Sequence, residues 1–245
     1  MNNYITVFVN YIDSEHIDTL FELLYSLGTE YWYMYKKGKL RLRIQEGEKS
    51  KVIQALEKNK YKYNVGHYEA EMYLFGGEYS LESVHCFFCH VAAINMKLRK
   101  ETQKDRDIVV LSLVNHIVNK AGFDYFEEWD VWKKVAAHRR INWEDSKEQV
   151  ISILPAVYQI INVEINSLPF FHDQQNIYNL NRITDFIAEI IAVPEEKLER
   201  GERGILSAII IFSFNMLEVD LQRQAGFVYA LSILKNPDFR EVFSK

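Results

Sequence analysis

Hydrophobic and polar residues alternate along the first 75 residues with two different periods. Runs of β-branched and aromatic residues with a period of two predict strands, and apolar residues three or four apart predict helices. The predicted strands cover residues 4–10, 30–35, 39–45 and 61–74, and the predicted helices cover residues 15–27 and 48–58. The order β-α-β-β-α-β is that of a ferredoxin-like unit, which has an antiparallel sheet with two helices on one face. The other face must also be covered, since it would otherwise expose a large apolar patch.

The pattern changes after Gly76-Gly77, where the helical spacing of apolar residues takes over. Ser80 is the predicted N-cap of a long helix, and Pro155 is a predicted kink or break in a later one. The predicted helices cover residues 81–101, 104–121, 124–139, 144–166, 176–192, 203–222 and 224–235. We therefore expect the α+β fold class, with a ferredoxin-like half at residues 1–75 packed on a helical half at residues 76–245 in one compact domain.

The charge balance of the 245-residue chain narrows the choice of partners. Lys and Arg number 29 and Asp and Glu number 34, a net charge of −5, whereas binding along a phosphate backbone needs a basic stripe. The first residues lack the basic segment and the cleavage site of a secretory signal. The uncharged stretch at residues 204–217 is too short to cross a bilayer. We expect a cytoplasmic protein that binds neither nucleic acid nor membrane.

Residues 85–90, His-Cys-Phe-Phe-Cys-His, contain both cysteines of the chain. The Cys-x-x-Cys-His spacing is that of c-type haem attachment, which usually belongs to exported chains. A zinc site would need a fourth ligand from elsewhere, and a redox dithiol would lie at the N-terminus of a helix rather than inside one. Buried reduced cysteines are common, so we interpret the pair as structural and predict no metal and no cofactor.

Arg41 and Arg43 are two residues apart on a predicted strand, so both guanidinium groups leave the same face. Arginine forks bind carboxylates or phosphates, so this pair is either a solvated sheet face or the cationic wall of a cleft. Glu69, Glu71 and Tyr73 alternate in the same way on the last predicted strand, either exposed to solvent or facing the arginines across that cleft. In the second arrangement a carboxylate could hold a substrate or position a proton donor.

Polar residues of the C-terminal half are a second set of candidates. Asn215 and Glu218 interrupt the apolar helix at residues 205–217, so they are either satisfied buried groups or part of a pocket wall. The basic residues at 133–134 and 138–140 are either a solvated helix end or a local site for an anionic peptide. The sequence contains no Walker, Gly-x-Ser-x-Gly or His-Glu-x-x-His motif.

Two parts of the sequence resemble the motifs of a known family. Residues 31–35 and 38–43, Tyr-Trp-Tyr-Met-Tyr and Gly-Lys-Leu-Arg-Leu-Arg, resemble its Phe-x-Arg-Tyr … Gly-x-His-Leu-Arg-Leu-Arg strand pair. Residues 68–77, Tyr-Glu-Ala-Glu-Met-Tyr-Leu-Phe-Gly-Gly, resemble its Tyr-x-Pro-Glu-x-Glu-Arg-Tyr-Gly-Gly motif, which also precedes a long helix. The family is that of thiopeptide-type bacteriocin biosynthesis proteins, whose fold is that of the C-terminal elimination domain of lantibiotic dehydratases. In the order of elements, the resemblance covers most of the chain.

Eliminating members of this family remove glutamate from a glutamylated Ser or Thr of a precursor peptide, which gives a dehydroamino acid. By the resemblance, Arg41, Arg43 and Glu71 match residues that hold the leaving glutamate. Other functional residues of the family are replaced. In the Gly-Gly motif, Leu74 stands for the arginine and Tyr73 for the glutamate beside it. The family also has a C-terminal His-Met-x-x-Asn-Arg motif; when its asparagine is aligned with Asn215, Ile211 stands for the histidine and Met216 for the arginine. An apolar residue neither transfers a proton nor holds a carboxylate, which argues against the usual elimination route.

Stand-alone members without these residues are similar to the pyridine synthases of thiopeptide biosynthesis. Such enzymes join two dehydroalanines of a linear, azole-bearing peptide in a formal (4+2) cycloaddition, after which water and the leader peptide are lost. The resemblance implies that Arg41, Arg43 and Asn215 bind the peptide, that Tyr73 is a proton donor and that Glu71 orients it.

Three functions remain open on this basis. The chain is a cyclising enzyme, a glutamate-eliminating small subunit of a split dehydratase, or a non-catalytic partner that binds the precursor peptide. The implied partners are the precursor peptide, both leader and modified core, and other enzymes of the same pathway. A full-length dehydratase carries a large glutamylation domain ahead of this module, for which 245 residues leave no room, so we expect a free-standing module.

Overall fold

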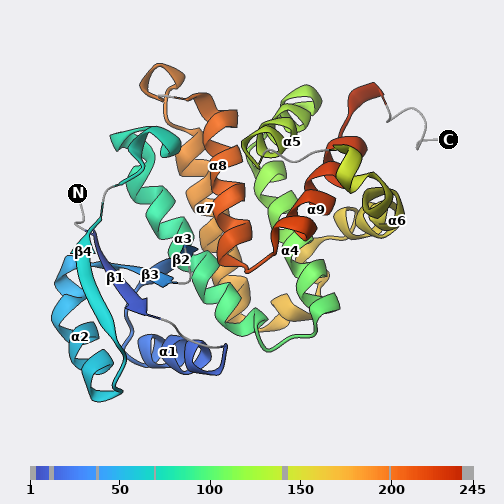
Figure 1. Cartoon of the computed structure of the whole chain (residues 1–245). Helices are drawn as coiled ribbons and strands as arrows, with labels where there is room; N and C mark the ends of the chain where they lie inside the picture. The colour runs from blue at the N-terminus through green and yellow to red at the C-terminus, as the bar shows by residue number, and fades with distance from the viewer. Residues whose placement is uncertain are drawn as a thin grey trace.

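The computed structural model describes residues 4–10, 14–36, 39–68, 70–139, 143–198 and 200–238, which form an α+β protein (Figure 1). Within these residues, short strands near the N-terminus form one antiparallel sheet, and most of the remaining residues are helical. The predicted α+β fold class is therefore confirmed.

The sheet has the strand order β2-β3-β1-β4, and each neighbouring pair of strands is antiparallel. Leu40, Leu42 and Ile44 of β3 are buried, whereas Arg41 and Arg43 alternate with them on the opposite face. The elements of this half are β1 (Tyr4–Asn10), α1 (Ser14–Ser26), β2 (Tyr31–Lys36), β3 (Lys39–Gln45), α2 (Lys49–Lys58) and β4 (Tyr63–His67).

The helices that follow pack on one another and on the sheet (Figure 1). They are α3 (Glu78–Leu98), α4 (Gln103–Lys120), α5 (Tyr125–Arg139), α6 (Trp143–Ile161), α7 (Gln174–Ile191), α8 (Gly201–Met216) and α9 (Leu221–Leu234). Both α3 and α8 pack against β2, where the buried ring of Trp32 lies 5.2 Å from that of Phe88. None of the described helices combines the length and the apolar character needed to cross a membrane.

The strand predicted at residues 61–74 is wrong in its second half. β4 ends at His67, and Met72–Phe75 form a 3₁₀ turn. Glu71 and Tyr73 therefore do not share one face of a strand, and Glu69 lies outside the described residues. The physical reason is topological, because the chain must leave the sheet here to enter α3.

The same turn sets the start of α3. The amide of Gly77 donates to the carbonyl of Met72 at 2.8 Å, and Gly76 has a φ of 83°, a left-handed conformation that favours glycine. α3 begins directly after Gly77, before the predicted start at residue 81. Ser80 is not its N-cap, because the Ser80 hydroxyl donates to the carbonyl of Phe75 instead.

Two other helices end earlier than predicted. α6 continues through Pro155 and ends at Ile161 rather than at residue 166. The predicted helix at residues 203–222 ends at Met216, because Asp220 begins a new helix by accepting a hydrogen bond of 2.9 Å from the amide of Arg223. The resulting loop between α8 and α9 borders the cavity described next.

Candidate functional site

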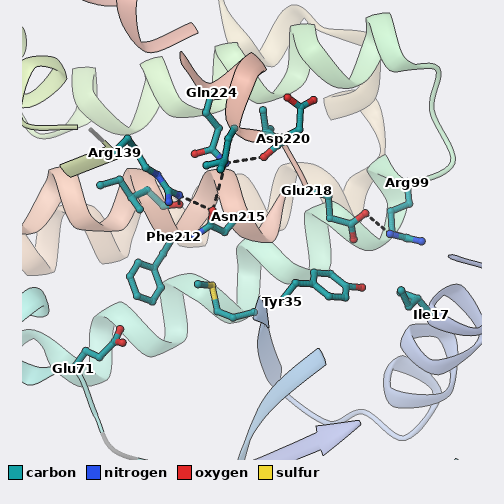
Figure 2. A pocket seen from close by; sticks show the side chains of 14 residues that line it. Ile17, Tyr35, Glu71, Arg99, Arg139, Phe212, Asn215, Glu218, Asp220 and Gln224 are labelled. Atoms are coloured by element: carbon teal, nitrogen blue, oxygen red, sulfur yellow. Dashed lines mark hydrogen bonds and ion pairs between the residues drawn. The ribbon is translucent and has the colours of Figure 1, made fainter. Parts of the chain in front are cut away.

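A cavity of about 760 Å³ lies where β2, the end of α8 and the start of α9 meet (Figure 2). Its volume is within the usual range of ligand-binding sites in proteins. Apolar and aromatic side chains form much of its wall, among them Met34, Tyr35 and Phe212. Its polar and charged lining includes Asn215, Glu218 and Gln224 from one segment, together with Glu71, Arg99 and Arg139 from distant parts of the sequence.

Asn215 connects two other helices in the wall of the cavity (Figure 2). Nη2 of Arg139, the last residue of α5, donates to Oδ1 of Asn215 at 2.5 Å and to the carbonyl of Ile211 at 3.2 Å. Nε2 of Gln224 in α9 donates to the same Oδ1 at 3.4 Å and to the carbonyl of Val219 at 2.7 Å. Burial lowers the pKa of Arg139, and its guanidinium forms no ion pair with a carboxylate of the described residues.

A second polar group of the cavity wall contains a buried ion pair. The side chain of Arg99 is 6% exposed, and its guanidinium pairs with Glu218 and with Asp18 of α1. Glu218 also accepts a hydrogen bond of 3.2 Å from Asn95 and one of 3.4 Å from the hydroxyl of Tyr33. These contacts tie the sheet, α1 and α3 to the loop between α8 and α9, so they fix the shape of the cavity.

Glu71 lines the cavity on the side away from Arg99 (Figure 2). Its carboxylate is close enough to Arg43 to raise the pKa of that guanidinium. The Arg43 guanidinium carbon lies 5.5 Å from the ring centroid of Trp32 and 4.9 Å from that of Tyr68. Burial lowers the pKa of Arg43 to about 10, although Tyr68 and Glu71 act to raise it. Nε and Nη1 of Arg43 are buried and have no hydrogen-bond partner in the described part of the chain.

The structure brings two of the predicted site residues, Glu71 and Asn215, into the lining of one cavity. Neither Arg43 nor Arg41 lines it. The guanidinium carbon of Arg41 lies 5.6 Å from the ring centroid of Phe8, its neighbour on β1, and the Nε of Arg41 is buried without a partner among the described residues. The predicted arginine pair therefore shares one sheet face, but only Arg43 interacts with the carboxylate of the cavity.

Tyr73, the predicted proton donor, does not line the cavity. It lies in the 3₁₀ turn directly before α3, and 61% of its surface is exposed. The guanidinium carbon of Arg200 lies 5.3 Å from the centroid of its ring, a typical cation–π distance. Tyr73 and Glu71 thus belong to one short segment but lie in different surroundings.

The His-Cys-Phe-Phe-Cys-His run lies inside α3 and faces more than one neighbour. Nε2 of His85 lies 2.8 Å from the hydroxyl of Tyr68, whereas Nδ1 of His90 lies 2.9 Å from Oδ1 of Asn179 on α7. Burial raises the pKa of both cysteine thiols. Across the described ranges, no group of three or more His, Cys, Asp and Glu side chains is placed to hold a metal ion.

The buried His85 predicts a pH dependence of stability. Burial, helped by the charge of Arg43, lowers the pKa of His85 to about 4, whereas an unfolded histidine titrates near 6.5. Between these values the unfolded state binds a proton that the folded state does not, so the free energy of unfolding falls as pH decreases from 6.5 towards 4. We expect a loss of about 3 kcal/mol from this residue over that range.

Urea unfolding at several pH values, with and without His85→Gln, measures this effect. The variant should lose less stability than the parent protein between pH 7 and pH 4, and the exposed His172, as His172→Gln, serves as the control. Parallel pH profiles for the His85→Gln variant and the parent protein would contradict the prediction.

Sequence reasoning missed the partners of Asn215. The basic run at residues 138–140 draws attention to Arg139 as a helix end, and Arg140 lies outside the described residues. Nothing in the spacing shows that α5 ends beside α8, because that contact arises only when the helices pack. Gln224 lies in the first turns of the helix that Asp220 caps. A single glutamine in a helix does not indicate from sequence which residue its side chain contacts.

Comparisons with known proteins add no relative, since no family model and no curated protein matches this chain. The site is therefore characterised by its own residues. They define an α+β protein with an open cavity between its sheet and its helices, lined by apolar and aromatic side chains, by paired charges and by the guanidinium of Arg139.

Proposed function

We propose that the cavity binds a segment of a modified precursor peptide, and that the protein is a cyclising enzyme of thiopeptide-type bacteriocin biosynthesis. The reaction is a formal (4+2) cycloaddition of two dehydroalanines to a pyridine-type ring, followed by loss of water and the leader peptide. One observation carries the proposal: Glu71 and Asn215, which belong to two separate motifs of the family resemblance, line the same cavity.

The proposed roles depend on positioning more than on strong acids or bases. A cycloaddition is accelerated when its two reacting groups are held close together, which rigid walls and a few directional contacts achieve. Asn215 and Arg43 would donate hydrogen bonds to peptide carbonyl oxygens, and Arg41 would extend this donor surface along the sheet face towards the leader. Tyr73 keeps its predicted role as proton donor, which requires the bound peptide to extend past Glu71 to the outer side of the 3₁₀ turn.

The ferredoxin-like assignment and the cytoplasmic location belong to the same proposal. The element order β-α-β-β-α-β and the sheet order β4-β1-β3-β2 support the ferredoxin-like assignment. The cytoplasmic location follows from the proposed substrate, since a ribosomal precursor peptide is made in the cytoplasm. The expected partners there are the leader of that peptide and the other enzymes of the pathway. The net charge of −5 supports the expectation that nucleic acid is not a direct partner.

One observation favours a second function, glutamate elimination within a split dehydratase. The position aligned with the arginine of the C-terminal motif is Met216, but Arg139 brings a guanidinium to within 2.5 Å of Asn215 from another helix. Such a guanidinium is suited to hold a leaving carboxylate. A non-catalytic precursor-binding partner is the third function that the cavity would serve.

Mass spectrometry of peptide products separates these functions. The purified protein is incubated with a dehydroalanine-containing core peptide attached to its leader, and in parallel with a glutamylated precursor. A macrocycle with released leader is the expected result. Loss of glutamate from the second peptide would replace the proposal with elimination, and leader binding without a change in mass would leave only the non-catalytic partner.

Replacement of Arg43 by alanine tests the cationic surface. We expect the affinity for the leader-bearing core peptide to fall about tenfold or more, since a hydrogen bond to a charged group contributes about 1.5–3 kcal/mol. Fluorescence anisotropy of the labelled peptide measures the change, and Arg203→Ala, at an arginine of α8 that pairs with Asp130 instead of facing the sheet, is the control. Unchanged peptide affinity and turnover would remove the proposed role of Arg43.

A further inference from the structure

The orientation of the Asn215 side chain is fixed by its neighbours. Nε2 of Gln224 must be the nitrogen of that amide, because it lies 2.7 Å from the carbonyl oxygen of Val219. Nε2 and the Arg139 guanidinium are both donors, so the atom of Asn215 that faces them must be its acceptor, Oδ1. The Nδ2 group of Asn215 therefore points away from this contact.

Two solvent-accessible hydrogen-bond donors are left over at this position, besides the buried Nε of Arg139, which also has no partner among the described residues. Within the described residues, neither Nδ2 of Asn215 nor Nη1 of Arg139 has a hydrogen-bond partner, and neither atom is sealed from solvent. Both side chains are half-buried in the wall of the cavity. The hydrogen bond from Nη2 of Arg139 to Oδ1 of Asn215 holds the two side chains to each other, so both free donors belong to one fixed pair of side chains.

The charges of the cavity indicate what these donors bind. Among the described lining residues, the carboxylates of Glu71, Glu218 and Asp220 outnumber the guanidinium groups of Arg99 and Arg139. Such a wall disfavours an anionic ligand, because added negative charge would be repelled in a partly desolvated site. A neutral oxygen acceptor satisfies both donors without that penalty.

We propose that Asn215 and Arg139 form a two-donor site for a backbone carbonyl oxygen of the bound peptide. This inference rests on the proposed peptide substrate and adds the specific contact that would set the register of the peptide in the cavity. Arg139 is therefore a binding residue in its own right, and Gln224 acts as a positioning residue that keeps Asn215 oriented.

Binding of a small blocked peptide tests the site directly. The probe is N-acetylalanine methylamide, titrated against the ¹⁵N-labelled protein and followed by the NMR signals of the Arg139 and Asn215 side chains. Its thionated analogue, with sulfur in place of both carbonyl oxygens, is a poorer acceptor and should bind more weakly. Sodium acetate at the same concentrations should bind no better than the peptide probe.

Asn215→Asp is the decisive variant. Aspartate keeps the oxygen that accepts from Arg139 and Gln224, but it replaces the donor group with a second acceptor that repels a carbonyl oxygen. We expect probe affinity to fall about tenfold or more, as for the loss of one hydrogen bond with an unpaired acceptor left behind. Asn166→Asp, at an exposed asparagine that does not line this cavity, should bind the probe as the parent protein does.

Three results with the probe would overturn the inference: unchanged probe affinity in the Asn215→Asp variant, equal binding of the thionated analogue, or tighter binding of acetate, which would indicate an anion site. The probe contains no dehydroalanine, so its binding does not depend on cyclisation. If it binds as expected while no precursor is turned over, the proposed function fails and the carbonyl site stands. If precursor is cyclised equally well by the Asn215→Asp variant, the site fails and the function stands.

Discussion

Replacement of Arg99 by methionine is expected to lower the free energy of unfolding by about 3 kcal/mol, which is typical for breaking a buried ion pair from one side. Methionine keeps the apolar stem, but it leaves the carboxylate of Glu218, which is 19% exposed, without its closest cation. Asp18 is half exposed and is rehydrated at little cost, and Arg106, 3.9 Å from Glu218, offsets a small part of the loss. Most of the effect therefore comes from Glu218.

A double-mutant cycle with Glu218→Gln, measured by urea unfolding, tests this account. The double variant should be more stable than the sum of the two single changes implies, because it buries no unpaired charge. The neighbouring Lys100 pairs with Glu22 of the same α1 helix, and both of these side chains are mostly exposed, so Lys100→Met should cost little. If Arg99→Met costs no more than Lys100→Met, the buried pair does not stabilise the fold.

The same pair matters for the cavity. Glu218 has a φ of 58°, an uncommon conformation for a residue other than glycine, and it is held there by Arg99, Asn95 and Tyr33. When Arg99 is removed, we expect the loop between α8 and α9 to lose this constraint. Arg99 is thus a structural residue that supports the position of the Asn215 side of the cavity.

The N-terminal half was predictable because its pattern is local. Alternation of Leu40, Leu42 and Ile44 with two arginines predicts which face of β3 is buried, and the structure confirms it. Helix α1 and the first three strands lie close to their predicted bounds for the same reason. When one face of a strand or helix is buried, its apolar residues recur every two or every 3.6 residues, respectively. The strands and helices of a small sheet covered by helices each bury such a face, so the pattern can be read from the sequence.

The segment after β4 was not predictable in this way. Its aromatic and apolar residues are typical of a strand, yet Met72–Phe75 form a 3₁₀ turn because the chain must reach α3. Tertiary connection overrides local preference here. The contact of Arg139 with Asn215 was equally out of reach, because it depends on how α5 packs beside α8 and not on either helix alone.

Replacement of Gly76 by alanine is expected to destabilise the protein by about 3 kcal/mol or more, from two independent causes. The φ of 83° disfavours any residue with a Cβ atom. In addition, a Cβ atom at this position would overlap Ile205 of α8 and would lie 2.7 Å from the Ser80 hydroxyl oxygen and 3.0 Å from Leu198. These neighbours of the turn are buried side chains, so making room for a Cβ atom requires the surrounding core to repack.

Gly122→Ala separates the two causes, since Gly122 has a similar φ of 71° but no atom within 4 Å of the position that a Cβ would occupy. It should cost about 1 kcal/mol, the conformational part alone. The excess in Gly76→Ala reports the packing of the 3₁₀ turn on α8, and Glu71 is displaced with that turn. We therefore expect Gly76→Ala, but not Gly122→Ala, also to weaken peptide binding measured by anisotropy. If the two variants lose the same free energy of unfolding, the turn and α8 are not in the close contact described.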